Sequence, residues 1–146
     1  MTAPKATKSI VLMRASVQKI DGKTYGTHVA PARGFLRAAN IAALLDVPKM
    51  AAWVRVGHKA GTLLLAFYPP GDMPLPDGYD DLGTARLTTD HRTDAFSIYL
   101  PSSIKDRLNL SFPDGHFPAV LSLAPGQRGG KAAHLLIEMA KEKRRT

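Results

Sequence analysis

The basic side chains are the residues of this chain best suited to recognising a partner. Twenty lysines and arginines stand against twelve aspartates and glutamates, so the net charge is +8. Four of the acids fall within residues 69–83, where there is no base, which leaves twenty bases against eight acids elsewhere. A surplus of this size favours a polyanionic partner, most often nucleic acid. The alternative is that the charge only keeps the protein soluble.

Arginines near two expected strand–helix junctions are the main candidates for contacting that partner. The forked guanidinium group fits both phosphate oxygens and the edge of guanine. A basic C-terminal tail would add attraction to phosphates without sequence preference, unless it is only the frayed end of a helix. For any single base, an ordinary solvated surface charge is the competing interpretation. The candidate nucleic-acid-binding residues are Arg33, Arg37, Arg86, Arg92, Lys105, Arg107, Lys143, Arg144 and Arg145.

Other kinds of chemistry find little support. The chain has no cysteine, and its five histidines are far apart, with no i, i+4 pair to hold a metal on one helix face. The glycines at 57–61 and 126–130 match no phosphate-binding loop, and Ser102 and Ser103 lack a nucleophile elbow. We therefore expect no enzyme, no metal and no cofactor. Trp53 is expected to pack in the core rather than to stack on bases.

A strand followed directly by a short helix is the most distinctive local pattern. Residues 95–100 alternate as a strand does, with Ile98 and Leu100 on one face. Pro101 ends the strand because it has no N–H to donate. Ser102 or Ser103 then caps a helix over residues 102–109, whose buried stripe includes Ile104 and Leu108.

The rest of the second half is predicted as strands separated by turns. Strands are expected at 84–89, 117–123 and 132–139, and Pro113-Asp114-Gly115 is a turn sequence. A helix over 131–143 competes with the last strand, since alanine, leucine, glutamate and lysine are good helix formers. Propensity alone leaves both possibilities open.

The first half repeats this pattern at an offset of 63 residues, with Ile41 falling on Ile104. Residues 34–36 then correspond to the strand and residues 39–45 to the helix, and a hairpin of strands follows at 53–56 and 63–67. An extra hairpin precedes this copy, with its turn at Asp21-Gly22-Lys23. A chance match between two amphipathic helices is the alternative explanation.

Residues 69–83 divide the two halves, because four prolines and three glycines prevent a helix or sheet interior there. The expected organisation is a first β-α-β-β unit with its N-terminal hairpin (8–68), this connector, a second unit (84–139) and a basic tail (140–146). Neither half alone is large enough to bury a core, so the two should share one.

The strand–Pro–helix unit at 97–110 resembles the swapped-hairpin DNA-binding module of AbrB/SpoVT-type transcription regulators. Two such copies in one chain look like the tandem arrangement of the MraZ family. The resemblance implies a β-rich α+β fold, with two pseudo-repeated β-α-β-β units forming a small swapped-hairpin-like barrel. The Asp-x-x-x-Arg signature of MraZ is absent, since Asp90 is followed four residues later by Asp94. No contact residue is therefore carried over from that family.

The expected function is a DNA-binding transcription regulator that contacts a duplex with a basic face and acts as a homo-oligomer. A single-strand binder would instead depend on aromatic residues such as Tyr25, Trp53 or Tyr99. A small protein-interaction or inhibitor module is the alternative from another class. The apolar run at 9–13 is too short for a signal-peptide core, so we expect a cytoplasmic protein without a membrane partner.

Overall fold

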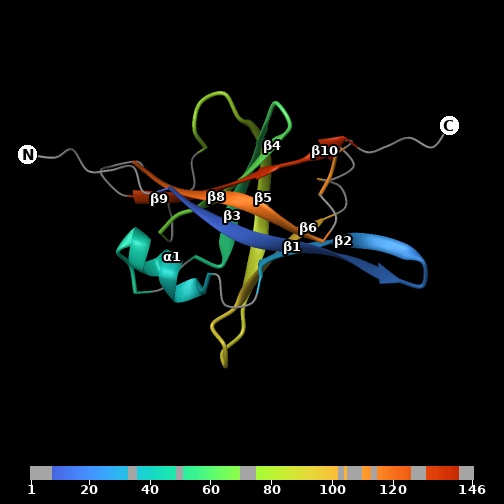
Figure 1. Ribbon diagram of the computed structural model, residues 1–146, viewed down its shortest axis with the longest axis horizontal. Helices are drawn as coiled ribbons and strands as arrows, with labels where there is room; N and C mark the ends of the chain where they lie inside the picture. Colours follow the sequence, from blue (N-terminus) through green and yellow to red (C-terminus); the bar gives the residue numbers. More distant parts are fainter. Residues whose placement is uncertain are drawn as a thin grey trace, which may run out of the picture.

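The computed structural model describes residues 8–32, 36–48, 51–69, 75–101, 104, 110–112, 115–125 and 131–141. Eight of its strands close into an antiparallel barrel in the order β1-β2-β6-β5-β3-β4-β9-β8, and β8 returns to pair with β1 (Figure 1). The barrel strands are β1 (Lys8–Ile20), β2 (Lys23–Pro31), β3 (Trp53–Lys59), β4 (Thr62–Phe67), β5 (Asp80–Thr89), β6 (Phe96–Pro101), β8 (His116–Pro125) and β9 (Lys131–Glu138).

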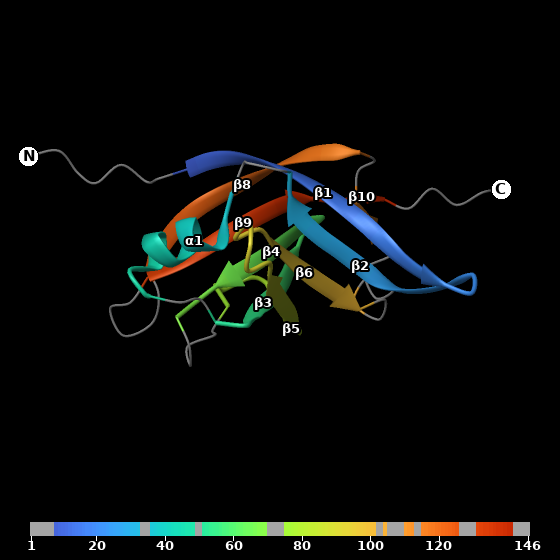
Figure 2. The ribbon, with the colours of Figure 1, turned by 90° about the horizontal axis from the view of Figure 1, so that it is seen from below.

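The helix α1 (Ala38–Leu45) lies outside the barrel, and a two-stranded sheet joins β7 (Leu110–Ser111) to β10 (Ala140–Lys141). Figure 2 shows α1 near one end of the barrel, while the β1–β2 hairpin extends away from it. The helix buries its apolar side, including Ile41 and Leu45, and ends at Asp46 in the left-handed conformation. The prediction of a β-rich chain with a helix at 39–45 is confirmed.

The hairpin turn predicted at Asp21-Gly22-Lys23 is confirmed. Asp21 and Gly22 both have positive φ and join β1 to β2, as a tight hairpin turn requires. The strand predicted at 95–100 is β6, and residues 131–138 are strand β9 rather than a helix. Pairing with β4 on one side and β8 on the other decides that choice, because both ladders satisfy its backbone groups.

Two predicted strand boundaries differ from the structure, and one predicted helix is described at a single position. Leu36 lies in no strand, and the strand that precedes α1 is β2, which ends at Pro31; Phe35 lies outside the described residues. Strand β5 begins at Asp80, inside the predicted connector, because it pairs with β3 as far as His58. Of the helix predicted at 102–109, Ile104 is helical and buried, and the other positions lie outside the described residues.

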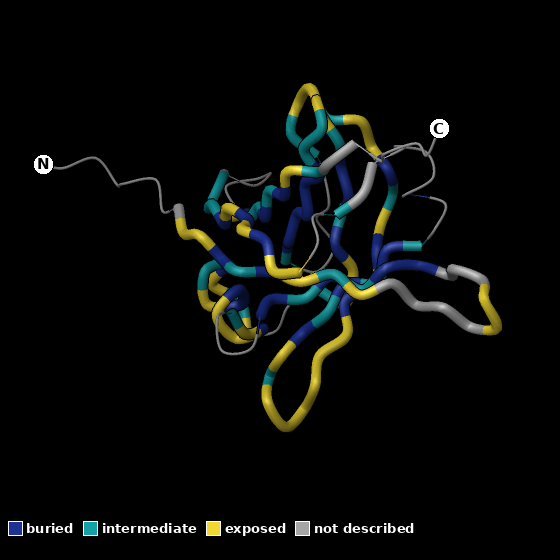
Figure 3. Tube along the Cα trace, turned by 45° about the vertical axis from the view of Figure 1, so that its right-hand side comes forward, coloured by how far each residue is buried: buried dark blue, intermediate teal, exposed yellow. Residues whose placement is uncertain are grey.

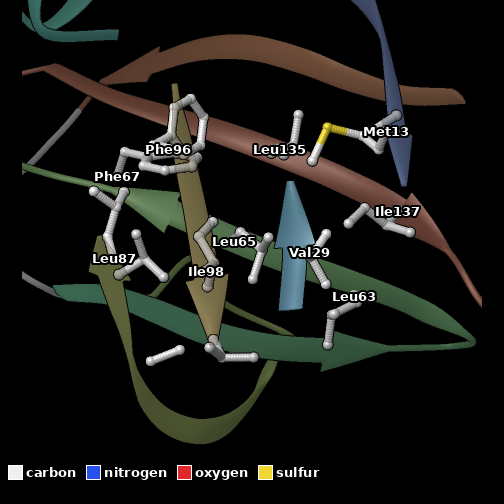
Figure 4. Packing of buried hydrophobic residues seen from close by; sticks show 14 of the residues in the cluster. Met13, Val29, Leu63, Leu65, Phe67, Leu87, Phe96, Ile98, Leu135 and Ile137 are labelled. Carbon is white, nitrogen blue, oxygen red and sulfur yellow. The ribbon is translucent and has the colours of Figure 1, made fainter. Parts of the chain in front are cut away.

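The core fills the barrel with inward-pointing aliphatic and aromatic side chains. Figure 4 shows side chains from β1, β2, β4, β5, β6 and β9 pointing toward one another, with the Phe67 and Phe96 rings at one end. Those two rings meet edge to face at 6.0 Å between centroids. Alternation along each strand puts one residue in two inside, as in β6, where Phe96, Ile98 and Leu100 are buried.

A second, smaller apolar cluster lies on the outer surface of β4 and β9. Ala66, Tyr68 and Ala132 are buried there, and Leu75 packs against them. A Cβ atom on Gly57 would lie 3.1 Å from the Leu75 side chain and 3.3 Å from Cβ of Tyr79. Residues 75–79 therefore cover this part of the wall. Figure 3 shows that exposed positions gather at the turns that project from the barrel.

Candidate nucleic-acid interface

A groove of about 860 Å³ lies where β1, β2, β5 and β6 meet the segment that leads into α1. Three exposed arginines line it: Arg14 from β1, Arg37 just before α1, and Arg92 from the β5–β6 turn. Side-chain hydroxyls lie among them, and two of these, Thr88 Oγ1 and Ser97 Oγ, are hydrogen-bonded at 3.0 Å. We call this site the arginine groove; its lining residues are Arg14, Ala30, Pro31, Ala32, Leu36, Arg37, Thr88, Thr89, Asp90, Arg92, Thr93, Ala95, Phe96 and Ser97.

The β5–β6 turn holds Arg92 at the rim through its own hydrogen bonds. The Arg92 N–H donates to Asp90 Oδ1 at 2.8 Å, and the Asp90 N–H donates to the Ala95 carbonyl at 2.8 Å. The Asp94 N–H donates to the Asp90 carbonyl at 2.9 Å, with Asp94 at a φ of 59°. Asp90 is the one described acid that lines the groove, and its carboxylate is occupied with the turn backbone.

Asp94 ties this turn to the start of α1, so both sides of the groove are fixed relative to each other. The Ala39 N–H donates to Asp94 Oδ2 at 2.8 Å, and the Ala38 N–H donates to the Asp94 carbonyl at 3.0 Å. A carboxylate at a helix N-terminus satisfies unpaired N–H groups and complements the helix dipole. The Arg37 N–H is held by Asn40 Oδ1 at 2.8 Å. Figure 1 shows the β5–β6 turn projecting from the barrel near α1.

The arginines of the groove are available to an outside anion. Among the residues that the structure describes, one ion pair is present, and it joins Arg55 to Asp81 away from the groove. Arg14, Arg37 and Arg92 therefore have no carboxylate partner within that part of the chain. Unpaired guanidinium groups beside hydroxyl groups suit phosphate oxygens, which accept hydrogen bonds from both.

Away from the groove, the ion pair between Arg55 and Asp81 shifts the pKa of both side chains. The Arg55 Nε–H donates to Asp81 Oδ1 at 2.9 Å, and this hydrogen bond lowers the pKa of Asp81. A second hydrogen bond from the Gly83 N–H at 2.9 Å lowers it further. The same pairing raises the pKa of Arg55. This pair fixes β3 to β5 and takes no part in the groove.

The structure places the candidate residues unevenly. Arg37 and Arg92 line the arginine groove, whereas Arg86 lies on the outer surface of β5 beside Trp53 and Tyr99 in the strand register. Six further candidates lie outside the described residues: Arg33, Lys105, Arg107, Lys143, Arg144 and Arg145.

Arg14 is a groove residue that the sequence analysis missed. A signal for it exists, since Arg14 follows buried Val11 and Met13 at the position where strand alternation points outward. The hydroxyl lining gave no comparable signal, because threonine and serine are common on exposed strand faces.

The structure also defines the surroundings of Trp53 and His134. Trp53 is 47% exposed, so its predicted place in the core is wrong; Val54 and Val56 point inward, which leaves Trp53 on the outer face. His134 is half-buried against the Tyr68 ring, and burial lowers its pKa. No group of three histidine, aspartate or glutamate side chains that could hold a metal occurs within the described ranges.

Comparisons with known proteins give no information on the arginine groove. No known protein family matches the chain, and neither curated proteins nor solved structures show a significant similarity to it. Within the described segments, no helix has the length and apolar character needed to cross a membrane.

Proposed function

We propose that this protein binds DNA by holding phosphate groups in the arginine groove. The observation that carries the proposal is that Arg14, Arg37 and Arg92 line one hydroxyl-containing groove without a carboxylate partner among the described residues. Phosphate contacts provide most of the sequence-independent affinity for DNA, and arginine is well suited to them. The net charge of +8 would add long-range attraction.

A pair of matched double variants tests the groove. Arg14→Ala with Arg92→Ala removes two charges at the groove, and Lys59→Ala with Lys131→Ala removes two charges from β3 and β9. We expect the groove variant to bind a labelled random duplex at least about tenfold more weakly at low salt, because each lost phosphate contact removes part of the counterion release. The plot of the logarithm of affinity against the logarithm of salt concentration should become less steep by about 1.8, because each phosphate contact contributes about 0.9 to this slope.

The control variant should retain nearly all of the affinity and most of the salt slope. Equal losses in the two variants would show that charge alone, and not the groove, controls binding. Failure of the unmodified protein to bind any duplex at low salt would contradict the proposal itself. Fluorescence anisotropy over a range of salt concentrations gives all of these values.

We propose duplex DNA as the main ligand and transcription regulation as the role, following the sequence resemblance to AbrB/SpoVT-type regulators. A regulator must prefer certain sequences, so selection from a pool of random duplexes should enrich a defined motif. The arginine side chains at the groove can read guanine edges as well as phosphates. Recovery of unchanged random sequences after several rounds would leave a non-specific DNA-binding protein instead.

We also propose that the chain consists of two related β-β-α-β-β units. Strand order supports this: replacing β1, β2, β3 and β4 by β5, β6, β8 and β9, and the reverse, returns the same closed order. Placing buried Ile41 on buried Ile104 puts Val54 on Phe117, and the observed registers then carry Arg14 to Arg86 and Leu63 to Leu135.

The proposed units interlock, since β1–β8, β2–β6, β3–β5 and β4–β9 each join one unit to the other. Co-expressed fragments 1–74 and 75–146 should therefore purify together. Two fragments that stay apart would count against the two-unit organisation.

A second candidate function is self-association or binding to another protein, and one observation favours it. Ile10 and Val120 are register partners on β1 and β8, and they are 75% and 36% exposed. Exposed apolar neighbours on a closed wall are typical of interaction surfaces. We propose a homo-oligomer on this basis. Sedimentation of the unmodified protein and of Ile10→Ser tests it, because the variant should shift toward monomer.

A further inference from the structure

Four side chains with aromatic or guanidinium groups form a continuous row across the outer wall of the barrel. The register pairs Trp53 with Arg86, Arg86 with Tyr99, and Tyr99 with His28. These residues come from β3, β5, β6 and β2, which are neighbours in the barrel order and lie in the same part of the wall in Figure 2. Directly opposed residues have Cβ atoms about 5 Å apart. We call this set the aromatic row.

The aromatic row is open to solvent at one end and fixed at the other. Trp53 is 47% exposed and Arg86 is also exposed, whereas Tyr99 and His28 are half-buried. The Tyr99 and His28 rings lie 5.1 Å apart at an interplanar angle of 53°. A Cβ atom on Gly26 would lie 2.7 Å from the Tyr99 ring, so the ring rests directly against the β2 backbone. Packing against the barrel wall therefore fixes the Tyr99 and His28 end of the row.

The aromatic row and the arginine groove form one surface. Thr88 and Ser97, which line the groove, are two residues along from Arg86 on β5 and from Tyr99 on β6. Residues two apart on a strand face the same side and are about 7 Å apart. A chain of nucleotides whose phosphates lie in the groove would thus bring its bases within reach of Trp53 and Tyr99.

We propose that the aromatic row is a base-stacking subsite for unpaired nucleotides of DNA that is held at the arginine groove. This inference rests on the proposed DNA-binding function. Aromatic rings bind bases of any sequence through their faces, and a neighbouring arginine adds a cation–π contribution. Bases inside a duplex are stacked on one another and expose only their edges, so the row selects unpaired bases.

The test compares a blunt duplex with the same duplex carrying a single-stranded thymidine overhang. Trp53 is the only tryptophan of the chain, so its fluorescence reports on this row alone. We expect the overhang to raise the affinity about tenfold and to quench Trp53 more than the blunt duplex does. Inorganic tripolyphosphate, which has charge but no bases, should cause no comparable quenching.

Variants of the row separate the inference from the proposed function. Trp53→Ala should remove the gain from the overhang and leave the affinity for the blunt duplex within about twofold, and Trp53→Phe should restore part of the gain. Circular dichroism melting shows whether each variant is folded, and Arg86→Ala offers a second test with a smaller expected loss. Arg14→Ala should weaken both DNAs alike.

Three results would overturn the inference. If the blunt duplex binds but the overhang adds no affinity or quenching, the row is not a base site, while the groove proposal stands. If Trp53→Ala weakens both DNAs equally, Trp53 supports the duplex contact and not unpaired bases. If neither DNA binds the unmodified protein, the proposed function fails together with the inference.

Discussion

Two parts of the barrel wall differ on the outside although their inner sides are alike. Where β2, β6 and β5 pair, three consecutive register partners that face outward are aromatic or charged, His28, Tyr99 and Arg86, and the next outward pair on β5 and β6 is Thr88 with Ser97. On the opposite part, consecutive register partners from β1, β8, β9 and β4 are all aliphatic: Ile10, Val120, Leu136 and Leu64. Both parts send aliphatic side chains inward to the same core.

The difference separates the requirements of folding from those of binding. Inward positions are apolar on nearly every strand because the barrel has a single interior, and Thr27 on β2 is the buried polar exception among the described residues. Outward positions are free to vary, and here they vary by region. The aliphatic row itself changes along its length, from 75% exposure at Ile10 to full burial at Leu64. Residues 75–79 lie over the outer surface near this buried end.

The largest expected effect comes from the two ends of the aliphatic row. Leu64→Ala should lower the free energy of unfolding by about 2–4 kcal/mol, because it leaves a cavity at a fully buried outward position. Ile10→Ala, at the exposed end, should change it by less than about 0.5 kcal/mol. Urea denaturation of both variants measures the contrast. Similar losses in the two would show that the row is equally covered along its length.

The second effect tests the other part of the wall. Gly26→Ala would place a Cβ atom 2.6 Å from the Leu100 carbonyl oxygen and 2.7 Å from the Tyr99 ring. Such crowding against backbone costs about 1–3 kcal/mol and should displace the ring from the wall. We expect lower stability and a changed Tyr99 environment in near-ultraviolet circular dichroism.

A double variant isolates the part of this cost that Tyr99 causes. In a Tyr99→Ala background, Gly26→Ala should cost less, since only the clash with the Leu100 carbonyl remains. An equal cost in both backgrounds would mean that Gly26 serves the backbone alone and not the position of the ring.

Local sequence patterns were sufficient for most of the strands and for the Asp21-Gly22 turn, but not for the order of the strands around the barrel. The Asp21-Gly22 turn and the alternation in β6 each depend on a few adjacent residues, so both can be recognised in the sequence. The closed order depends on pairings such as β2 with β6, which join residues about seventy positions apart and have no local signal. The same holds for the choice of strand over helix at β9, which its two neighbouring strands decided.

The candidate site was predictable in its chemistry and only partly in its location. Composition indicated an anion-binding surface, and Arg37 and Arg92 do share a groove. Arg14 joins them because β1 pairs with β2 in the N-terminal hairpin, which places Arg14 beside Ala30 of the groove, and Arg86 lies apart because it falls in the register of Trp53 and Tyr99. The exposure of Trp53 follows from the inward direction of Val54, which residue type alone does not reveal.

The third effect is a pH dependence of the free energy of unfolding that arises from His134 on β9. Burial lowers the pKa of His134, so its protonation is easier in the unfolded chain than in the folded one. His134 should therefore not reduce the free energy of unfolding above the ordinary histidine pKa of about 6.5. The free energy of unfolding should decrease as the pH falls from that value toward the lowered pKa. Denaturation at pH 7.5 and 5.5 should show this loss.

His134→Gln should reduce the difference in unfolding free energy between the two pH values, because glutamine does not titrate. His91→Gln is the matched control, since His91 is exposed on the β5–β6 turn. The Tyr68 ring lies 6.3 Å from the His134 ring, so Tyr68→Phe should leave the pH dependence unchanged if burial is the cause. A pH dependence that persists unaltered in His134→Gln would assign it to another group.

The smallest effect concerns the ion pair that joins β3 to β5 beside the covered surface. Asp81→Asn should cost about 0.5 kcal/mol at neutral pH, because the pair is partly exposed and screened by solvent. Asp80→Asn is the matched control, since Asp80 is the exposed neighbour. The pKa of Asp81 is lowered, so its contribution is present above the ordinary aspartate pKa and disappears as the pH falls through the lowered value. Asp81→Asn and the unmodified protein should therefore converge in stability in acid, and a constant difference at all pH values would show that the charge of Asp81 does not stabilise the fold.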